Sequence, residues 1–590
     1  MAHAAVAKNL GSLTGVGAHA QALAKIEALE EAAEAMVARK KSNGLLRRGI
    51  KAWKRGDVVR AGQLSLDATA ADPTNAQAFH VLGMALEKMG HLHKALVTYE
   101  QAYKIDPGDP ELLINLGLTA WNLKLKEGAE KMFRLFIAAR PDSPLGYNNL
   151  GSIQCDMGNT STAIETLRSA IMRMPEETIL WNSIATVLAE VGRAEESLIF
   201  YQEAIRLDPG FSRPYHNIGY AFQHLGRLEE ALEAYDEALK RAIDEAERRE
   251  AKHSRSICLI GMGRLKEGWR EYEIRNDQRF RAYVHHMTKA PVWKNEPLDG
   301  KRILMVGEQG LGDEFMFANI LPDIQEAVGE NGKLQIAVDK RLVSLFSRSF
   351  PKADVGAYED RQFVDSNGKK ELRFIPWATA NGDPDFFAPM GTALQYYRSR
   401  IEDFPRRAFL VPDSERKDVF RKQIETFGPG PFVGICWRSM VLGQKRGKYY
   451  SALDSWGPIL KTPGVTFINL QYGDCREEIA RAEDRHGVKI NVIEGLDLKD
   501  DLDGAAALSA AVDLVISAPT AAAATAGAVG TEVWFLTAGR TWPQLGTDEF
   551  PWYRKSRVFS PVKFADWTEL MPRVGRALAD YTASPDYCCC

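Results

Sequence analysis

The residues with the clearest chemical potential lie in a glycine-rich turn, MVGEQGLGDEFMFANIL (305–321). Gly307, Gly310 and Gly312 separate an apolar run, typical of a strand, from a predicted helix that begins near Asp313. Glycines allow a ligand to approach the backbone, and the N-terminus of a helix favours negative charge. The spacing matches neither the dinucleotide G-x-G-x-x-G nor the phosphate-binding loop. The turn therefore predicts a ligand site, unless Asp313 only caps its helix.

This turn belongs to a region in which strands and helices alternate. After about residue 280, β-rich apolar runs recur at 302–308, 333–339, 432–438, 465–471, 512–518 and 531–537. Alternation of this kind predicts parallel, doubly wound sheets. The runs form two clusters joined by a stretch that contains FGPGP (427–431). Two such lobes around a cleft predict a GT-B-type architecture, because ligands bind at the carboxyl ends of parallel strands. A two-domain dehydrogenase is the alternative.

The first half of the chain has a 34-residue period. Small residues and prolines recur in three series: Gly49, Gly83, Gly117, Gly151, Ala185 and Gly219; Ala61, Ala95, Ala129, Ala163, Ser197 and Ala231; Pro73, Pro107, Pro141, Pro175 and Pro209. This pattern predicts tetratricopeptide repeats, in which small residues let paired helices approach and proline ends the second helix. A degenerate seventh unit follows at 261–273. Such arrays bind extended polypeptide, so we expect a protein partner.

The N-terminal segment has a different character. Residues 1–15 are rich in glycine and alanine, and we expect them to be mobile. Residues 21–40 predict an amphipathic helix with Leu23, Ile26 and Leu29 on one stripe. We expect this helix to cap the repeat array, with a coiled-coil dimer as the alternative.

Extended blocks of sequence resemble a known family. The run APVWKNEPLDGKRILMVGEQGLGDEFMFANILPDI (290–324) resembles the start of the glycosyltransferase domain in bacterial proteins that fuse tetratricopeptide repeats to a GT-B domain, which is distantly similar to lipopolysaccharide heptosyltransferases. The resemblance continues through VGICWRSM (433–440), INLQYGD (468–474), the segment 501–530 and WYRKSRVF (552–559). Within this group the chain most resembles the flagellin glycosyltransferases of alphaproteobacteria. The resemblance implies repeats that recruit flagellin and a GT-B domain that transfers pseudaminic acid from its CMP-activated form to Ser or Thr.

The resemblance also implies roles for individual residues. The aspartate of the heptosyltransferase Gly-Asp turn is a proposed general base, and it corresponds here to Asp313, with Gly310 and Gly312 beside the donor. Attack of a hydroxyl on an oxocarbenium-like centre must release a proton, so a nearby carboxylate suits the reaction. Related transferases often have a histidine where this chain has Ala524, which leaves the identity of the donor open.

Further residues are expected to bind the nucleotide-sugar donor: Trp437, Arg438, Ser439, Arg446, Gln471, Tyr472 and Thr520. Arg438 and Arg446, with Lys445 and Lys448, could neutralise a phosphate leaving group, or they could form a solvated basic loop. Thr520 opens an Ala/Gly-rich helix whose N-terminus could hold a phosphate.

Asparagines recur at one position of the repeats. Asn115, Asn149 and Asn217 occupy it, and Ser183 fills the intervening unit. Amides on the concave face can bond a peptide backbone without reading its sequence, and the array is similar in this respect to the nucleocytoplasmic O-GlcNAc transferase. We expect these asparagines to bind the acceptor; the alternative is that exposed helix positions simply tolerate asparagine.

Composition excludes several classes of function. The 590 residues carry a formal net charge of −3, which gives no basic surplus for nucleic acid. Neither a membrane span nor a signal peptide is evident, and seven scattered cysteines fit a reducing cytosol, so we expect a cytoplasmic protein. Metal-ligand motifs are missing, which predicts a metal-independent enzyme that needs no cofactor. The terminal Cys588–Cys590 triplet is most simply a frayed tail.

Together these features predict a multidomain protein, an all-α tetratricopeptide superhelix followed by a GT-B α/β domain of two Rossmann-like lobes. The expected parts are an N-terminus with a capping helix (1–41), repeats (42–280), a linker (281–300), an N-terminal lobe (301–405), an interlobe linker (406–431), a nucleotide-sugar-binding lobe (432–575) and a tail (576–590). Two other functions stay open: a scaffold or export chaperone with inactive lobes, and a transferase acting on lipid or oligosaccharide.

Overall fold

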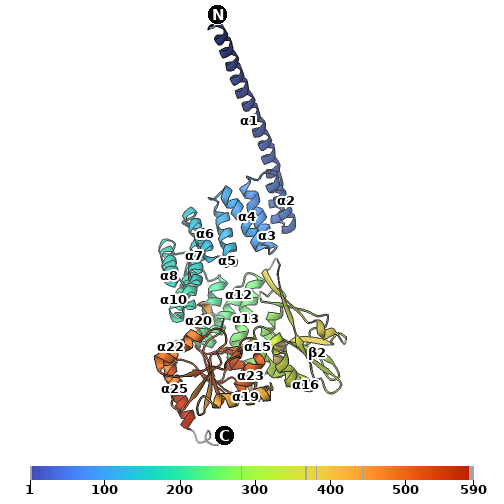
Figure 1. Ribbon diagram of the computed structural model, residues 1–590, viewed down its shortest axis with the longest axis vertical. Coiled ribbons are helices and arrows are strands. Elements are labelled where there is room, and N and C mark those ends of the chain that lie inside the picture. The colour runs from blue at the N-terminus through green and yellow to red at the C-terminus, as the bar shows by residue number, and fades with distance from the viewer. Residues whose placement is uncertain (1–2, 281, 366–367, 381, 441–443, 584–590) are drawn as a thin grey trace. The chain divides into compact units, whose positions relative to one another are not determined.

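The computed structural model describes residues 3–280, 282–365, 368–380, 382–440 and 444–583. The chain divides into two compact units: residues 1–166 with the short segment 364–369, and residues 167–363 with 370–590. Figure 1 shows helices throughout the N-terminal part and a mixture of helices and strands in the remainder. The Cys588–Cys590 triplet lies outside the described residues.

The helices of the repeat region pair as the 34-residue period predicts. They are α1 (His3–Lys54), α2 (Val58–Ala71), α3 (Ala76–Lys88), α4 (Leu92–Ile105), α5 (Pro110–Asn122), α6 (Lys126–Ala139), α7 (Pro144–Met157), α8 (Thr160–Arg173), α9 (Thr178–Glu190), α10 (Ala194–Leu207), α11 (Ser212–His224), α12 (Leu228–Arg241), α13 (Glu245–Gly261) and α14 (Leu265–Tyr272).

Steric packing explains the glycine series. A Cβ atom added to Gly83 would lie 2.5 Å from the ring of Tyr99, and one added to Gly117 would lie 2.6 Å from the ring of Phe133. Both rings are fully buried, so neither can move aside. The aromatic residue of the second helix thus occupies the space that the glycine of the first helix leaves open.

Helix α1 differs from the expected capping helix. It continues without a break to Lys54, and among its residues from Leu23 onward the first buried side chains are those of Ser42 and Leu46. The predicted apolar stripe is exposed instead: Leu23, Ile26 and Leu29 retain 49%, 52% and 69% of their accessible surface. The interpretation of residues 21–40 as a cap packed on the array is therefore wrong. Amphipathicity gives the side of a helix that could be buried, but it does not supply the surface that buries it.

The second unit contains two parallel sheets. One has the strand order β4-β3-β2-β7, from β2 (Arg302–Val306), β3 (Lys333–Val338), β4 (Asp354–Ala357) and β7 (Phe386–Pro389). The other has the order β10-β9-β8-β11-β12-β13, from β8 (Phe432–Cys436), β9 (Thr466–Asn469), β10 (Ile490–Asn491), β11 (Leu514–Ser517), β12 (Glu532–Leu536) and β13 (Ser556–Phe559). The strand pairings in both sheets, as far as the structure describes them, are parallel. The prediction of parallel sheets in this region is confirmed.

The strand order of each sheet reverses at its first strand. In the smaller sheet β3 and β7 lie on opposite sides of β2, and in the larger sheet β9 and β11 lie on opposite sides of β8. Such a reversal is the topological switch point at which open α/β sheets bind ligands. The glycine-rich turn follows β2, and Trp437–Ser439 follow β8, so both predicted segments lie at switch points.

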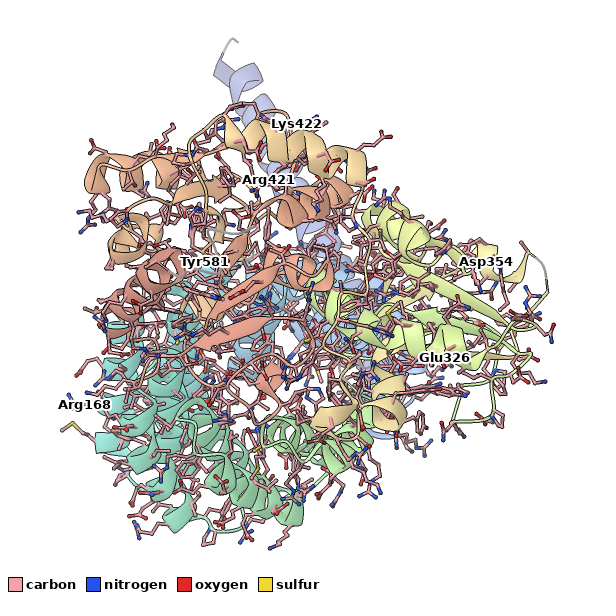
Figure 2. All side chains as sticks on the ribbon, turned by 90° about the horizontal axis from the view of Figure 1, so that it is seen from below. Arg168, Glu326, Asp354, Arg421, Lys422 and Tyr581 are labelled. Carbon is pink, nitrogen blue, oxygen red and sulfur yellow. The ribbon has the colours of Figure 1, made fainter. Side chains whose placement is uncertain are left out.

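Helices cover the sheets, and their side chains tie the layers together (Figure 2). Those of at least seven residues are α15 (Leu311–Phe317), α16 (Leu321–Ala327), α17 (Val343–Ser349), α18 (Met390–Tyr397), α19 (Ser414–Glu425), α22 (Arg476–His486), α23 (Leu502–Ala511), α24 (Ala521–Ala528) and α25 (Trp567–Ala583). Arg421 of α19, labelled in Figure 2, donates from Nη1 to Asp513 Oδ1 at 2.8 Å. A third sheet, β1-β6-β5, joins β1 (Val284–Met287) to the hairpin of β5 (Glu359–Asp365) and β6 (Gly368–Phe374).

One hydrophobic core connects the last repeat helices to both sheets. Trp269 of α14 is 1% exposed and lies edge-on to Trp542 and Trp552, with ring centroids 6.2 Å away in each case. Its indole Nε1 donates to the carbonyl of Arg398 at 2.9 Å. Trp293, from the predicted linker, is buried in the same core. The end of the repeat array is thus built into the α/β region.

Candidate functional site

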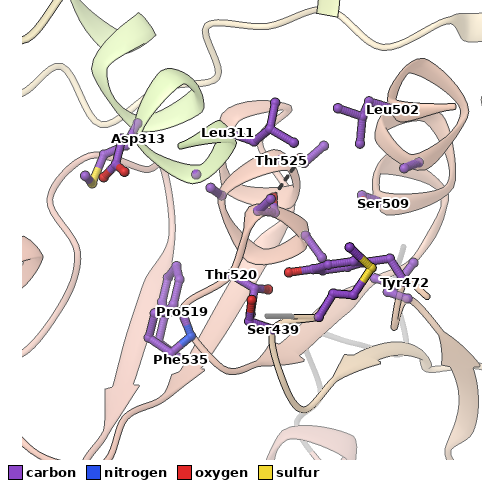
Figure 3. Close-up of a pocket in the computed structure, with 18 of the residues that line it drawn as sticks. Leu311, Asp313, Ser439, Tyr472, Leu502, Ser509, Pro519, Thr520, Thr525 and Phe535 are labelled. Carbon is purple, nitrogen blue, oxygen red and sulfur yellow. Dashed lines mark hydrogen bonds between the residues drawn. The ribbon is translucent and has the colours of Figure 1, made fainter. Parts of the chain in front are cut away.

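A cavity of about 610 Å³ lies where the two switch points meet. Its wall includes residues that follow four strands: the start of α15 after β2, Ser439 after β8, Tyr472 after β9 and Thr520 after β11. Figure 3 shows Asp313 on α15, with Ser439, Thr520 and Tyr472 gathered nearby and Leu502 and Ser509 on α23. The carboxyl ends of both parallel sheets therefore contribute to one cavity.

Asp313 provides the carboxylate of this cavity. Gly310 is the N-cap of α15, and its backbone N–H donates to Asp313 Oδ2 at 3.3 Å. Burial, with a smaller contribution from the nearby Glu308 carboxylate, raises the pKa of Asp313 to about 6, although the Gly310 N–H and Arg446 act to lower it. A carboxylate with this pKa is ionised at neutral pH and more basic than an ordinary aspartate. It can therefore accept a proton from a bound hydroxyl.

The start of α24 faces the same cavity. Thr520 is its N-cap and has no side-chain cap hydrogen bond; its hydroxyl lies 3.4 Å from Ser517 Oγ and 3.5 Å from Cys436 Sγ. Gly312 lies close by, since a Cβ added to it would be 3.8 Å from the backbone nitrogen of Ala521. Unpaired backbone N–H groups at such a helix start favour an anion.

A polar cluster extends this wall. Ser439 forms side-chain hydrogen bonds with Tyr450 and Tyr472, and burial raises the pKa of both phenols. Arg446 also lines the cavity and has an exposed side chain. Two phenols, a hydroxyl and a guanidinium can bind the hydroxyl and phosphate groups of a polar ligand.

The structure brings together six of the residues predicted for chemistry or donor binding: Gly312, Asp313, Ser439, Arg446, Tyr472 and Thr520. The other four predicted residues bond to protein groups around the cavity instead of lining it. Gly310 caps α15, as described. Trp437 is fully buried and donates from Nε1 to Glu478 Oε2 at 2.5 Å, and the Arg438 Nε lies 2.9 Å from each Glu478 carboxylate oxygen. The cation expected at the phosphate is thus already paired with a carboxylate.

Gln471 binds backbone rather than the cavity. Its Oε1 accepts from the N–H groups of Trp437 and Arg438 at 3.1 and 3.0 Å, and its Nε2 donates to the Arg438 carbonyl at 2.9 Å. The side chain is 1% exposed. Gln471 therefore fixes the path of the segment that carries Ser439 into the cavity.

The side chains of the basic segment that follows β8 make contacts in two different places. Arg446 reaches the cavity, whereas Lys448 donates to the carbonyl of Ala189 in α9 at 3.3 Å. Tyr449 Oη lies 3.1 Å from His224 Nε2 and 3.1 Å from Tyr220 Oη, both on α11. Lys448 and Tyr449 therefore attach this segment to the repeats. The side chain of Lys445 lies outside the described residues.

Two of the repeat asparagines form contacts with the preceding repeat. Asn115 Nδ2 lies 2.9 Å from His80 Nε2, and Asn217 Nδ2 donates to Asn182 Oδ1 at 3.0 Å. Asn149 is 7% exposed, and its Nδ2 has no hydrogen-bond partner within the described part of the chain. Of these three amide nitrogens, the Asn149 Nδ2 is the one that is buried without a hydrogen-bond partner in the described residues.

Sequence reasoning missed the residues that shape the cavity and its loop. Phe535 stacks on Phe550 at 4.1 Å, and both line the cavity with Tyr553. Glu308 was passed over although it stands inside the glycine-rich turn. It pairs with Arg275, from the end of the repeats, at 2.8 Å. The sequence did contain a signal for Glu308, since it is a charged residue in an otherwise apolar and glycine-rich stretch. A carboxylate that is buried there requires a partner of opposite charge.

Comparison with known proteins agrees with this architecture. Residues 76–109, 148–210 and 200–233 each match a model of the tetratricopeptide repeat. The chain is a tetratricopeptide-repeat protein with an α/β region that contains parallel sheets. Over 545 residues it is 40% identical to Protein FlbA of Caulobacter vibrioides, which covers 91% of this chain and 90% of that protein. The chain therefore belongs to the FlbA family.

Solved structures of tetratricopeptide-repeat proteins match a part of the chain. YrrB, a TPR protein with an unusual peptide-binding site, is 21% identical over 32% of this chain and 97% of its own, with a TM-score of 0.24. A tetratricopeptide repeat protein from Parabacteroides merdae is 15% identical over 40% of this chain and 91% of its own, with a TM-score of 0.36. In the described residues, no helix is both long and apolar enough to span a bilayer.

Proposed function

We propose that this protein is an O-glycosyltransferase that transfers a sugar from a nucleotide-activated donor to a Ser or Thr hydroxyl of a polypeptide. The acceptor we propose is flagellin, and the donor is CMP-pseudaminic acid or a related activated nonulosonic acid. Both follow from the resemblance of residues 290–559 to flagellin glycosyltransferases. The two parallel sheets then correspond to the lobes of a GT-B domain.

The observation that carries this proposal is the position of Asp313. It lies in a cavity that residues beyond the carboxyl ends of both sheets enclose, and burial raises its pKa to about 6. Glu314, the adjacent carboxylate, has its pKa raised to about 7 by burial, but it binds the Tyr358 hydroxyl and the Asp339 N–H instead of lining the cavity. Asp313 is therefore the carboxylate best placed to act as a base.

The proposed reaction is a single displacement. Asp313 removes the proton of the acceptor hydroxyl while that oxygen forms a bond to the anomeric carbon of the sugar. The bond between the anomeric carbon and the phosphate oxygen breaks, and its electron pair leaves with the nucleotide. Arg446 and the N–H groups at the start of α24 stabilise the negative charge that develops on the phosphate. A displacement with one general base inverts the anomeric centre.

The repeats supply the acceptor to this reaction. A polypeptide held along the array is presented to the cavity at a raised effective concentration, which favours transfer to proteins over free hydroxyl compounds. Asn149, whose Nδ2 has no partner in the described residues, can bond the backbone of this polypeptide without requiring a particular sequence.

The test is the intact mass of flagellin from cells that carry the wild-type protein, Asp313→Asn or Glu326→Gln at matched levels. Asn keeps the shape of Asp but cannot accept the proton. Glu326 is an exposed carboxylate on α16 (Figure 2), so its substitution controls for the loss of one negative charge. We expect flagellin heavier by whole sugar units with the wild type and Glu326→Gln, and bare flagellin with Asp313→Asn.

Other outcomes point to other functions. Bare flagellin in all three strains would reject flagellin as the acceptor and favour a scaffold or a different substrate. Full glycosylation with Asp313→Asn would reject Asp313 as the base. The mass increment in the wild type identifies the sugar.

A further inference from the structure

A second cavity, of about 580 Å³, lies beside the glycine-rich loop. Its lining comes from α11, α13, the turn after α14, β1, the loop after β2 and β6, and it includes His216, Glu250, His253, Ser254, His286 and Glu371. Its volume is within the roughly 300–1,000 Å³ typical of ligand sites. None of the roles assigned above uses this cavity.

The loop lies against both cavities. Glu308 and Gln309 line the second cavity, whereas Leu311, Gly312 and Asp313 line the first. Four residues span at most about 14 Å, which is the upper limit for the Cα separation of Gln309 and Asp313. Gln309 has a positive φ of 63°, and its amide bonds the Tyr272 hydroxyl, so α14 fixes the loop at the junction. A ligand in the second cavity is thus within a few residues' length of the proposed base.

The chemistry of the second cavity differs from that of the first. The guanidinium of Arg275 is already bound, to Glu308 at 2.8 and 2.9 Å and to Glu273 at 2.7 Å, so it is not available to an anion. Burial lowers the pKa of His253 and of His286 to about 4, with Arg275 adding to the effect at His253 and Arg373 at His286. Both imidazoles are neutral at pH 7. Of the other charged groups at the wall, Glu371 accepts from Arg373 Nη2 at 2.9 Å, and Glu250 is exposed.

Polar groups in this cavity are positioned to bond a neutral ligand. His216 Nε2 lies 2.9 Å from Ser254 Oγ, and this contact joins α11 to α13. His286 Nε2 is buried and has no hydrogen-bond partner among the residues that the structure describes. A buried polar nitrogen left without a partner costs about 1–3 kcal/mol, and a bound ligand would remove that cost. Neutral imidazoles can donate to or accept from amide and hydroxyl groups.

We infer that the second cavity binds the segment of the acceptor polypeptide that carries the Ser or Thr to be modified. The occupant is a short, uncharged polar stretch of chain. Its amides bond the imidazoles and Ser254, and its hydroxyl reaches across the loop to Asp313. The Glu250 carboxylate at the wall, and the absence of an available cation among the described lining residues, disfavour the anionic nucleotide donor, which occupies the first cavity. This inference rests on the proposed transferase function and adds the place at which the acceptor enters.

The test is photocrosslinking of the full-length protein to purified flagellin monomer. Two variants place p-benzoylphenylalanine in the cavity, one at Ser254 and one at the exposed Glu250, so that the second remains informative if the first fails to fold. The control places it at Glu233, an exposed position on α12 that does not line the cavity. The variants also carry Asp313→Asn, so that crosslinking reports binding without turnover.

We expect about tenfold more crosslinked flagellin from positions 250 and 254 than from 233, because a bound segment is held near the probe at millimolar effective concentration. The crosslinked peptide should contain a Ser or Thr that the wild-type protein glycosylates. Equal crosslinking at all three positions, with normal glycosylation by the wild type, overturns the inference and leaves the proposed function in place. Absence of glycosylation by the wild type overturns the proposed function and, with it, this inference.

Discussion

Arg275 and Glu308 form a buried ion pair between the end of the repeat array and the glycine-rich loop. Arg275 donates from Nε to Glu308 Oε2 at 2.8 Å and from Nη2 to Glu308 Oε1 at 2.9 Å, and each residue is 6% exposed. Glu308 also accepts the N–H of Gly391 at 2.7 Å. The parallel two-point contact fixes the orientation of the carboxylate. The loop that carries Asp313 is therefore held by a residue of the helical region.

Breaking this pair should destabilise the protein. Arg275→Met leaves the buried Glu308 carboxylate without its cation, and we expect the free energy of unfolding to fall by about 3–5 kcal/mol. Adding Glu308→Gln should recover part of the loss. Arg279→Met, which breaks an exposed pair with Asp277, is the control and should cost less than about 1 kcal/mol. Urea denaturation of the four proteins measures these differences; equal losses at Arg275 and Arg279 would contradict a buried pair.

The rate of transfer should depend on the ionisation of Asp313. Because its pKa is raised to about 6, the proposed base is lost as pH falls through this value. We expect kcat/KM for flagellin to be flat above pH 7 and to fall about tenfold per pH unit well below 6. The residual rate of Asp313→Asn should lack this limb. A limb that persists unchanged in the variant would assign the titration to another group.

The same pKa shift predicts an effect on stability. The folded-state pKa of Asp313 lies above its ordinary value of 3.8, so ionisation costs stability above pH 6 and not below 3.8. We expect Asp313→Asn to raise the free energy of unfolding by about 1–3 kcal/mol at pH 7. The gain should vanish near pH 3.5. Thermal melts of the two proteins at both pH values test this, and a destabilised variant at pH 7 would refute it.

Substitutions of Arg446 and of Arg438 should have different effects on nucleotide binding. Arg446 lines the first cavity, whereas Arg438 is paired with Glu478. We expect Arg446→Gln to weaken CMP binding about tenfold, since a charge-assisted bond contributes roughly 1.5 kcal/mol. Arg438→Gln should instead lower the melting temperature. Calorimetric titration with CMP measures the first effect, and unchanged affinity in Arg446→Gln would remove that residue from the donor site.

Two glycines in neighbouring helices should respond in opposite directions to substitution by alanine. A Cβ on Gly117 would lie 2.6 Å from the buried ring of Phe133, and we expect Gly117→Ala to cost about 1–3 kcal/mol. Gly128 of α6 has no atom within 4 Å of an added Cβ, so Gly128→Ala should stabilise by about 0.5–1 kcal/mol. Urea midpoints decide the matter; a stabilising Gly117→Ala would disprove the close approach of the helix pair.

The sequence was most informative where local rules are strict. Period and proline spacing located the paired helices, because glycine and proline act through backbone geometry within one unit. Apolar runs located the parallel strands, because buried strands in such sheets are apolar on both faces. The cavity residues Asp313, Ser439 and Thr520 could be found because loops that follow parallel strands meet at one edge of a sheet.

Long-range partners were beyond sequence reasoning. Arg438 was expected to bind a phosphate, but its guanidinium is paired with Glu478, 40 residues later in the chain. Arg275 was not singled out, since its partner Glu308 lies 33 residues away in a different fold element. The prediction that the apolar stripe of α1 packs on the array was wrong for the same reason. A residue pattern does not indicate which surface another segment covers.

The tryptophan residues packed around Trp269 determine where the repeats could be exchanged for those of another protein. Its partners Trp542 and Trp552 belong to the α/β region, so a cut near residue 280, where the helical period ends, would pass through one folding unit. A chimaera that replaces the repeats should be joined near Leu167, where the two compact units divide. Residues 1–166 can then vary in sequence, while the final repeat helices are retained together with the α/β region that they help to build.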